Sequence, residues 1–390
     1  MAVSLLSNEV SDLCLGKPAL RSLSISTTIG DALIALKRSS DQSSLSVWSC
    51  ICRRRKPNKE CDEEICECVG KICMVDVVCF LGKEENLKNP FSALQLPISV
   101  LIPNIKTTPS LVRQLEPHAR VWDAIDAILD GAQNLVIPLK SLKRKFQLHS
   151  SKSMINPSTI HNNLEYCWLT QEDIIRYLLN SIGLFSSISI QPIDSLNIIN
   201  TQNILSINYA DHAMSALQPI LKSLENQTSV AITDDDGKIM GEISPFILNY
   251  CEESVAAAIT TLSAADLMSY IDCGGPPEDL IQLVKKRLEE RNLTSALELI
   301  EEETGLSSSS NSLLCSSSDE ESTVLGRSGR SVRNVRSLEP IVCYPWSSLV
   351  AVMIQALSHR ASYVWVVEED GTLVGIVTFA AILGVFREKF

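Results

Sequence analysis

The stretch Tyr363-Val-Trp-Val-Val-Glu-Glu-Asp-Gly-Thr-Leu-Val-Gly-Ile-Val-Thr378 decides the fold of this chain. It contains two runs rich in Val and Ile, separated by Asp370-Gly371. β-Branched and aromatic residues favour strands, and Asp-Gly between two apolar runs is a strong signal for a tight hairpin. The stretch therefore predicts one strand that begins at Val364 and a second, antiparallel strand over residues 373–378.

The same pattern occurs four times along the chain. In each copy an apolar stripe with helical spacing precedes a β-type run, so a helix should lead into a buried strand. The stripe is clear in three copies and weaker in the first, where Lys37 takes an apolar position. The stripes begin at Ile29, Val121, Ala213 and Leu349, and the β-type runs begin at Leu45, Leu135, Val230 and Val364.

A second strand follows each β-type run, at residues 69–73, 166–170, 239–244 and 373–378. The third copy repeats the tight turn as Asp236-Gly237, whereas the first two turns are enlarged by insertions at 51–64 and 140–165. A short first strand is predicted at 21–25, 204–207 and 341–343, and closing helices at 75–81, 172–179 and 379–386. One unit is therefore strand, helix, strand, strand, helix.

This unit resembles the CBS domain, the repeat named after cystathionine β-synthase. The resemblance is clearest in the quoted stretch, and the third copy repeats it with Gly241-Glu-Ile-Ser244. The opening Val10-Ser-Asp-Leu-Cys-Leu-Gly-Lys-Pro18 resembles the family's lead-in helix. The chain is similar to the plant CBSX group of stand-alone, multi-copy CBS proteins. The resemblance implies an α+β fold in which CBS copies pair into two Bateman modules, because a single copy leaves one face uncovered.

The copies divide the chain as follows. Copy 1 covers 8–90, copy 2 covers 94–186, copy 3 covers 187–272 and copy 4 covers 338–390. Residues 276–303 read as a charged amphipathic helix, with Leu280, Leu283, Val284 and Leu288 on one face. Residues 304–337 are Ser-rich with few apolar residues, which predicts a flexible linker. A regulated or partner-binding segment is the alternative interpretation of that linker.

Composition excludes several classes of protein. The 390 residues carry 34 Lys and Arg against 46 Asp and Glu, a net charge of -12, which disfavours nucleic-acid binding. No apolar run approaches the ~20 residues that cross a bilayer, so we expect a soluble protein that does not bind membranes. The start of the chain lacks a signal or transit pattern. The 13 cysteines then indicate a reducing compartment, the cytoplasm or alternatively the nucleus.

The resemblance implies a nucleotide site at the end of each second strand, at a Ser/Thr-x-x-Asp motif. In the family the hydroxyl meets phosphate and the carboxylate receives both ribose hydroxyls of an adenosine nucleotide. Copy 2 carries the full motif in Thr170 and Asp173, and copy 1 keeps only the acid, Asp76. Copies 3 and 4 have Ile247 and Ala381 at the acid position. The implied ligands are AMP, ADP, ATP or S-adenosylmethionine, bound by the N-terminal module.

A ligand-free interpretation of the same motif remains open. Thr170 and Asp173 also have the spacing of a helix N-cap and its acidic third residue, which stabilises a helix by about 1 kcal/mol. Ser263 and Asp266 share that spacing, and we interpret Leu262-Ser-Ala-Ala-Asp-Leu-Met268 as the lead-in helix of copy 4 rather than a displaced site.

The remaining motifs carry little chemistry. Cysteines cluster in the first insertion as C-x-C blocks, whereas zinc sites favour C-x-x-C, so we assign no metal ligands and expect a solvated loop with reduced thiols. The five histidines form no catalytic motif, and P-loop and dinucleotide-binding motifs are lacking. We assign no catalytic residues. The clustered cysteines are Cys50, Cys52, Cys61, Cys66 and Cys68.

These observations predict a non-enzymatic regulatory protein that senses an adenosine nucleotide, binds and regulates a partner protein, or does both. An interaction scaffold that binds no nucleotide is the alternative, and a metal- or redox-responsive protein acting through the cysteine loop is a more distant one. The sequence does not identify the partner protein, and it leaves a homodimer open.

Overall fold

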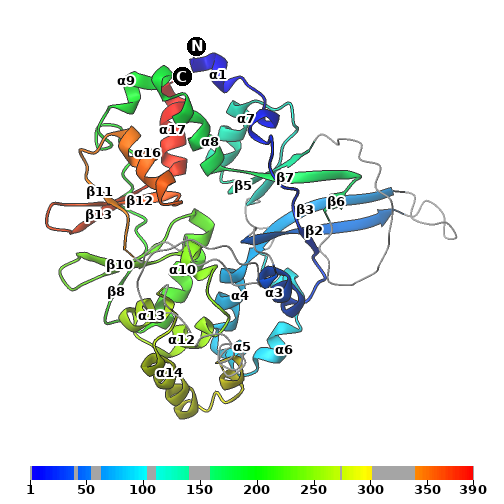
Figure 1. The fold of residues 1–390 in the computed structure, drawn as a ribbon, viewed down its shortest axis with the longest axis vertical. Coiled ribbons are helices and arrows are strands. Elements are labelled where there is room, and N and C mark those ends of the chain that lie inside the picture. The colour runs from blue at the N-terminus through cyan, green and yellow to red at the C-terminus, as the bar shows by residue number, and fades with distance from the viewer. Residues whose placement is uncertain are drawn as a thin grey trace, which may run out of the picture.

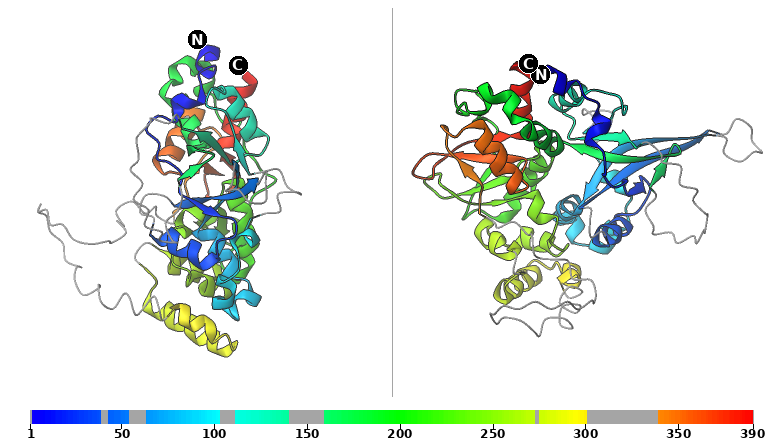
Figure 2. Two further views of the ribbon diagram at one scale, coloured as in Figure 1. Left: turned by 90° about the vertical axis from the view of Figure 1, so that its right-hand side faces the viewer. Right: turned by 45° about the horizontal axis from the view of Figure 1, so that its top comes forward.

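The computed structural model describes residues 2–38, 43–53, 63–102, 111–139, 159–272, 275–300 and 339–389. Within these residues, four small sheets share one topology, in which a first strand pairs parallel to the second and the next returns antiparallel. The sheet of copy 2 has one further short strand at its edge. The edge-on view in Figure 2 shows that the four copies form a flat arrangement. This is the predicted α+β fold of four strand-helix-strand-strand-helix repeats. The linker 304–337 lies outside the described residues.

Copies 1 and 2 form the N-terminal half (Figure 1). In copy 1, β2 runs through Arg53 and β3 starts at Glu63, so the hairpin strands extend into the predicted insertion. In copy 2, a two-residue hairpin at Asn162 and Asn163, both with positive φ, joins β6 to β7. The elements of copy 1 are α1 (Ala2–Leu6), α2 (Val10–Leu13), β1 (Ser22–Ser24), α3 (Ile29–Lys37), β2 (Ser44–Arg53), β3 (Glu63–Cys73), α4 (Met74–Leu81), α5 (Glu84–Leu87), α6 (Pro90–Leu94) and η1 (Ile98–Val100). Those of copy 2 are β4 (Val112–Gln114), α7 (Val121–Leu129), β5 (Asn134–Pro138), β6 (Ile160–His161), β7 (Leu164–Thr170), α8 (Gln171–Asn180), η2 (Ile182–Phe185) and α9 (Ser186–Ser189).

Copies 3 and 4 carry the predicted tight hairpins. Gly237 and Gly371 have φ values of 78° and 89°, a left-handed conformation that glycine adopts without steric cost. The elements of copy 3 are β8 (Ser206–Asn208), η3 (Ala213–Ala216), α10 (Leu217–Asn226), β9 (Val230–Thr233), β10 (Ile239–Ile243), α11 (Pro245–Leu248), α12 (Val255–Thr261) and α13 (Ala264–Ile271). Those of copy 4 are β11 (Val342–Cys343), α16 (Leu349–Ser358), β12 (Tyr363–Val367), β13 (Leu373–Thr378) and α17 (Phe379–Lys389).

The segment between α13 and the linker differs from the expected single helix. The helix α14 (Glu278–Glu290) ends before Asn292, whose φ of 57° is left-handed and breaks the helical path. A second helical stretch covers residues 295–300. The buried face of α14 consists of Ile281, Val284 and Leu288, and it packs on α12.

Lead-in segments cross reciprocally between copies. Isolated β-bridges join the lead-in segment of each copy to the residue that precedes the first helix of its neighbour. Copies 1 and 2 exchange these contacts with each other, and so do copies 3 and 4. The segment at Ser263 therefore occupies, relative to copy 3, the place that the segment at Glu9 occupies relative to copy 2. The bridges are Glu9–Arg120, Thr28–Pro97, Pro192–Ser348 and His212–Ser263.

The two halves pack through their helices (Figure 1). In the lower part of that view, α4 of copy 1 contacts α10 and α12 of copy 3, within one continuous apolar core. In the upper part, α7 and α8 of copy 2 contact α17 of copy 4, within a second core. A third, smaller cluster that includes Trp48 and Tyr166 fills the space between the sheets of copies 1 and 2. Among the described residues, no helix combines the length and the apolar character needed to cross a bilayer.

Candidate functional site

Thr170 and Asp173 form a capping box at the start of α8. The Thr170 hydroxyl accepts from the Asp173 amide at 3.3 Å, and Asp173 Oδ2 accepts from the Thr170 amide at 2.7 Å. The Thr170 hydroxyl also donates to the same carboxylate oxygen at 2.7 Å. These bonds satisfy amides that a helix N-terminus leaves without partners, which explains why the helix begins here. The capping interpretation of the motif is therefore realised in this structure.

Lys17 from the lead-in segment of copy 1 reaches this motif in copy 2. Its ammonium forms an ion pair with Asp173 Oδ2 and donates to the Trp168 carbonyl at 2.8 Å. The Lys17 and Asp173 side chains are 21% and 18% exposed, so the pair is largely shielded from water. The reciprocal crossing of lead-in segments is what brings residues 17 and 173 together.

A pair of buried thiols lies near Lys17. Cys14 and Cys167 are buried and hydrogen-bonded to each other, which lowers the pKa of Cys14. The charge of Lys17 acts in the same direction, while burial and Asp173 oppose it. Lys17 and Cys14 could not be predicted as site residues, because nothing in the local sequence signals a partner more than 150 positions away.

Asp76 occupies the equivalent position in copy 1 and has different surroundings. Its Oδ2 accepts from the Cys73 amide at 2.7 Å, so it also caps a helix, α4. Burial raises the pKa of the Asp76 carboxyl, and the hydrogen bonds from Cys73 oppose that shift. The charge of Lys71 opposes the shift as well, and copy 1 thus presents a partly buried acid without the neighbouring hydroxyl. Asp76 and Asp173 belong to separate positions, each in its own copy.

Copies 3 and 4 use the equivalent hydroxyls as helix caps. The Ser244 hydroxyl accepts from the Phe246 amide at 3.2 Å, and Thr378 Oγ1 accepts from the Ala381 amide at 3.2 Å. Neither position has a carboxylate three residues later that could receive a ribose.

A buried carboxylate joins the sheets of copies 3 and 4. Glu242 on β10 is fully buried and accepts from the Tyr363 hydroxyl at 3.0 Å and from Trp365 Nε1 at 2.7 Å. Two residues before the motif position, copy 2 has Trp168 and copy 1 has Lys71. In copies 3 and 4, the hydrogen-bonded side chains of Glu242, Tyr363 and Trp365 therefore lie between the two sheets.

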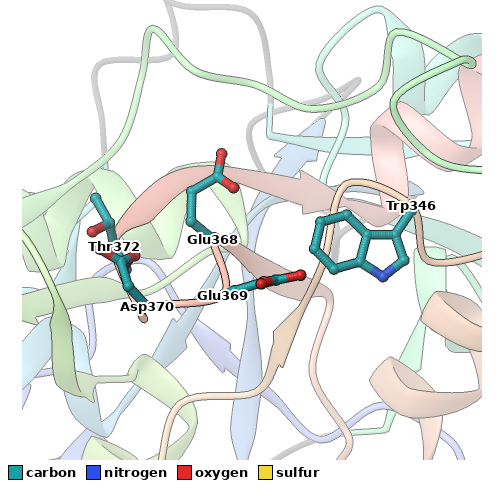
Figure 3. A pocket seen from close by; sticks show the side chains of 5 residues that line it. All are labelled: Trp346, Glu368, Glu369, Asp370 and Thr372. Carbon is teal, nitrogen blue, oxygen red and sulfur yellow. Dashed lines mark hydrogen bonds between the residues drawn. The ribbon is translucent and has the colours of Figure 1, made fainter.

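An open hollow of about 410 Å³ lies at the Asp370-Gly371 turn, away from the capping motif of copy 2. Figure 3 shows the carboxylates that line it, from Glu368, Glu369 and Asp370, with Trp346 on the opposite side. Hydrogen bonds from Thr372 lower the pKa of Asp370, so this carboxylate stays ionised at neutral pH. Three acidic groups would repel a phosphate, and this hollow does not suit a nucleotide.

The cysteine-rich hairpin divides into two kinds of thiol. The Sγ atoms of Cys50 and Cys66 lie close to the imidazole of His161, which comes from β6 of copy 2. Cys68 is buried and donates to the Gly70 carbonyl at 3.6 Å, and burial raises its pKa to about 12. The side chains of Cys52 and Cys61 lie outside the described set. No local sequence signal links His161 to these cysteines, because it belongs to another copy of the repeat.

The chain is similar to known proteins over its whole length. Residues 332–388 match the CBS domain family. The chain is 44% identical to the CBS domain-containing protein CBSX5 of Arabidopsis thaliana, over 100% of this chain and 98% of that protein. It is 21% identical to the SNF1-related protein kinase regulatory subunit gamma-like PV42b of the same plant, over 82% of this chain and 75% of that one.

A solved structure shares the fold. Protein MJ1225 of Methanocaldococcus jannaschii, proposed as an archaeal homologue of γ-AMPK, superposes with a TM-score of 0.53. The match covers 97% of this chain and 99% of that one, at 15% sequence identity. At this identity the comparison bears on architecture alone.

Proposed function

The chain belongs to the family of CBS domain-containing proteins, and on that premise we propose that it is a regulatory protein without catalytic activity, whose N-terminal pair of copies binds an adenosine nucleotide. One observation carries the proposal. Thr170, Asp173 and Lys17 bring a hydroxyl, a carboxylate and an ammonium together at the N-terminus of α8.

The three groups match the parts of a nucleotide. The contacts described above all use Asp173 Oδ2, so Oδ1 is the oxygen from which ribose hydroxyls would displace solvent. The Thr170 hydroxyl and the helix N-terminus suit a phosphate. Lys17 would turn from Asp173 to the phosphate, exchanging one ion pair for another. AMP, ADP, ATP and S-adenosylmethionine all carry the ribose that the carboxylate would recognise. Asp76 is the weaker, second candidate contact, because its pKa is raised by burial and because Cys73 replaces the hydroxyl that Thr170 supplies in copy 2.

The relatives support a regulatory role that acts on a partner protein. PV42b is by name a regulatory subunit of a protein kinase, so a kinase is the class of partner to which binding would be relayed. The 13 cysteines favour a reducing compartment, the cytoplasm or alternatively the nucleus.

The test is calorimetric titration of the full chain with AMP, ADP, ATP and S-adenosylmethionine. We expect Asp173→Asn to weaken nucleotide binding roughly tenfold to hundredfold, since a hydrogen bond to a charged group contributes ~1.5–3 kcal/mol. Asp123→Asn is the matched control, because Asp123 caps α7 of the same copy through the Arg120 amide at 2.8 Å. Lys17→Gln should weaken the binding of ATP more than that of adenosine, because adenosine has no phosphate for Lys17 to contact.

A scaffold that binds no nucleotide is the second candidate. It is favoured by the capping box and ion pair that already engage Asp173, and by Glu242 between the C-terminal sheets. For a scaffold, Asp173→Asn and Asp123→Asn would lower the melting temperature by similar small amounts, and none of the four ligands would bind. Tight binding that survives Asp173→Asn combined with Asp76→Asn would place the nucleotide elsewhere.

A further inference from the structure

A cluster of metal-binding side chains lies at the junction of copies 1 and 2, apart from the capping motif. Cys50 on β2 and Cys66 on β3 are directly opposite each other in the antiparallel ladder. His161 on β6 lies beside them, and the two Sγ atoms and a ring nitrogen all lie within 4.8 Å of one another. We propose that Cys50, Cys66 and His161 form a zinc site that joins the first hairpin of copy 1 to the β6–β7 hairpin of copy 2.

The spacing of the donor atoms fits a tetrahedral ion. Zinc binds thiolate sulfur at ~2.3 Å and imidazole nitrogen at ~2.0–2.1 Å, which puts the two ligand atoms about 3.6 Å apart around a tetrahedral centre. Cys50 Sγ and His161 Nδ1 are 3.5 Å apart. Two thiolates and one imidazole form a ligand set that zinc favours over hard cations.

The histidine ring is held in the orientation that this site requires. His161 Nε2 is hydrogen-bonded to the Ser22 hydroxyl at 2.6 Å, so the ring can donate there and present Nδ1 to a metal. The imidazole stacks on Trp48 with ring centroids 3.9 Å apart and planes inclined by 3°.

The neighbouring residue fixes the hairpin that carries His161. The Asn162 side chain donates to the Cys66 carbonyl and accepts from the Cys66 amide, both at 2.8 Å. These two hydrogen bonds fix the position of β6 against β3. Cys66 is buried and Cys50 is exposed, so the ion would have three protein ligands and one position open to water. Zinc would then connect the two copies across their junction.

The experiment uses the reduced full chain, stripped with a chelator and then loaded with Zn²⁺ or with Co²⁺ as a spectroscopic substitute. We expect one Zn²⁺ per chain after desalting, and a thiolate-to-cobalt charge-transfer absorption for the Co²⁺ form. Cys50→Ser and His161→Gln should each lower the affinity for Zn²⁺ by at least about 100-fold, because each removes a ligand. Ser22→Ala keeps all three ligands and should lower the affinity for Zn²⁺ roughly 10- to 100-fold, because His161 loses the hydrogen bond that orients its ring.

Two matched controls separate ligand loss from general damage. Cys68→Ala removes the next thiol on the same strand face, and His118→Gln removes an exposed histidine that contacts Glu9. Both should retain stoichiometric Zn²⁺. The proposal is wrong if Cys50→Ser and His161→Gln bind Zn²⁺ as tightly as the parent chain. It is also wrong if Zn²⁺ depends only on Cys52 and Cys61, or if alkylation before isolation recovers Cys50 and Cys66 as a disulfide.

Discussion

At the level of single residues, the same sequence position has different electrostatic roles in different copies. Asp173 lies beside the ammonium of Lys17 and the hydroxyl of Thr170, whereas burial raises the pKa of Asp76 against the opposing charge of Lys71 and no hydroxyl accompanies it. Both side chains cap a helix, so capping alone does not distinguish them. Lys17 comes from a distant segment of the chain, so the tertiary structure, and not the motif, gives Asp173 its ammonium neighbour.

The raised pKa of Asp76 predicts a specific pH dependence. The native carboxyl keeps its proton to a higher pH than the unfolded one, whose pKa is ~3.9, so native stability falls as the pH rises through that window. Asp76→Asn removes this loss. We therefore expect the free energy of unfolding of the variant, relative to the parent chain, to increase from pH 4 toward neutrality.

Urea denaturation at a series of pH values measures this difference. Asp123→Asn, which removes a more exposed carboxylate from the same capping position, controls for loss of the cap itself. An advantage of Asp76→Asn that shrinks as the pH rises would contradict the assignment of a desolvated acid.

At the level of elements, two glycines of copy 4 show how tightly its strand and its helix are packed. A Cβ at Gly375 on β13 would lie 2.6 Å from Ile199 Cγ2 and 2.9 Å from the Asn200 carbonyl oxygen. The segment that leads into copy 3 crosses β13 here, through the bridge between Asn200 and Ile376. At Gly384 on α17, the nearest atom would be Leu129 Cδ2 at 3.9 Å, an ordinary contact.

Alanine at these two positions should have opposite effects on stability. Gly375→Ala forces the crossing backbone to move, and we expect it to lower the free energy of unfolding by about 1–3 kcal/mol. Gly384→Ala should raise it by roughly 0.5–1 kcal/mol, because alanine favours a helix over glycine. Denaturation midpoints of the two variants test this. Equal effects, or a neutral Gly375→Ala, would show that the crossing segment is loosely held.

At the level of the whole molecule, each pair of copies covers apolar helix faces of the other. A Cβ at Gly82, just after α4, would lie 3.3 Å from Leu217 Cδ1 of copy 3, which shows how closely the lower cores meet. At the upper contact, Arg387 of α17 pairs with Asp126 of α7 and lies 4.9 Å from the ring of Trp122. The two cores therefore each combine one copy from either half.

This packing predicts that residues 2–186 will not remain monomeric as an isolated fragment. The fragment would expose the faces of α4, α7 and α8 that the other half covers, and large exposed apolar patches promote association. It should begin at residue 2, because Leu6 is fully buried and Tyr177 donates to the Leu5 carbonyl. Size-exclusion chromatography with light scattering should show dimers or larger species. A stable monomer at high concentration would contradict the proposed burial.

Removal of the linker should have a small effect on stability. We expect a chain without residues 305–336 to stay folded, because the entropy of loop closure changes only slowly with length. The melting curve should remain a cooperative transition near that of the full chain. Disappearance of that transition would show that the segment belongs to the folded core.

The strands, helices and tight turns could be predicted from the sequence, and the tertiary contacts could not. Asp370-Gly371 specifies its hairpin because dihedral preferences and neighbouring hydrogen bonds act within a few residues. The repeat pattern likewise identified four copies, and the spacing of Thr170 and Asp173 predicted the helix cap that they form. Only the tertiary structure placed Lys17 on Asp173 and His161 beside Cys50. These contacts join segments far apart in the chain through reciprocal crossing and sheet packing, and such distant pairings leave no periodic signal in either segment.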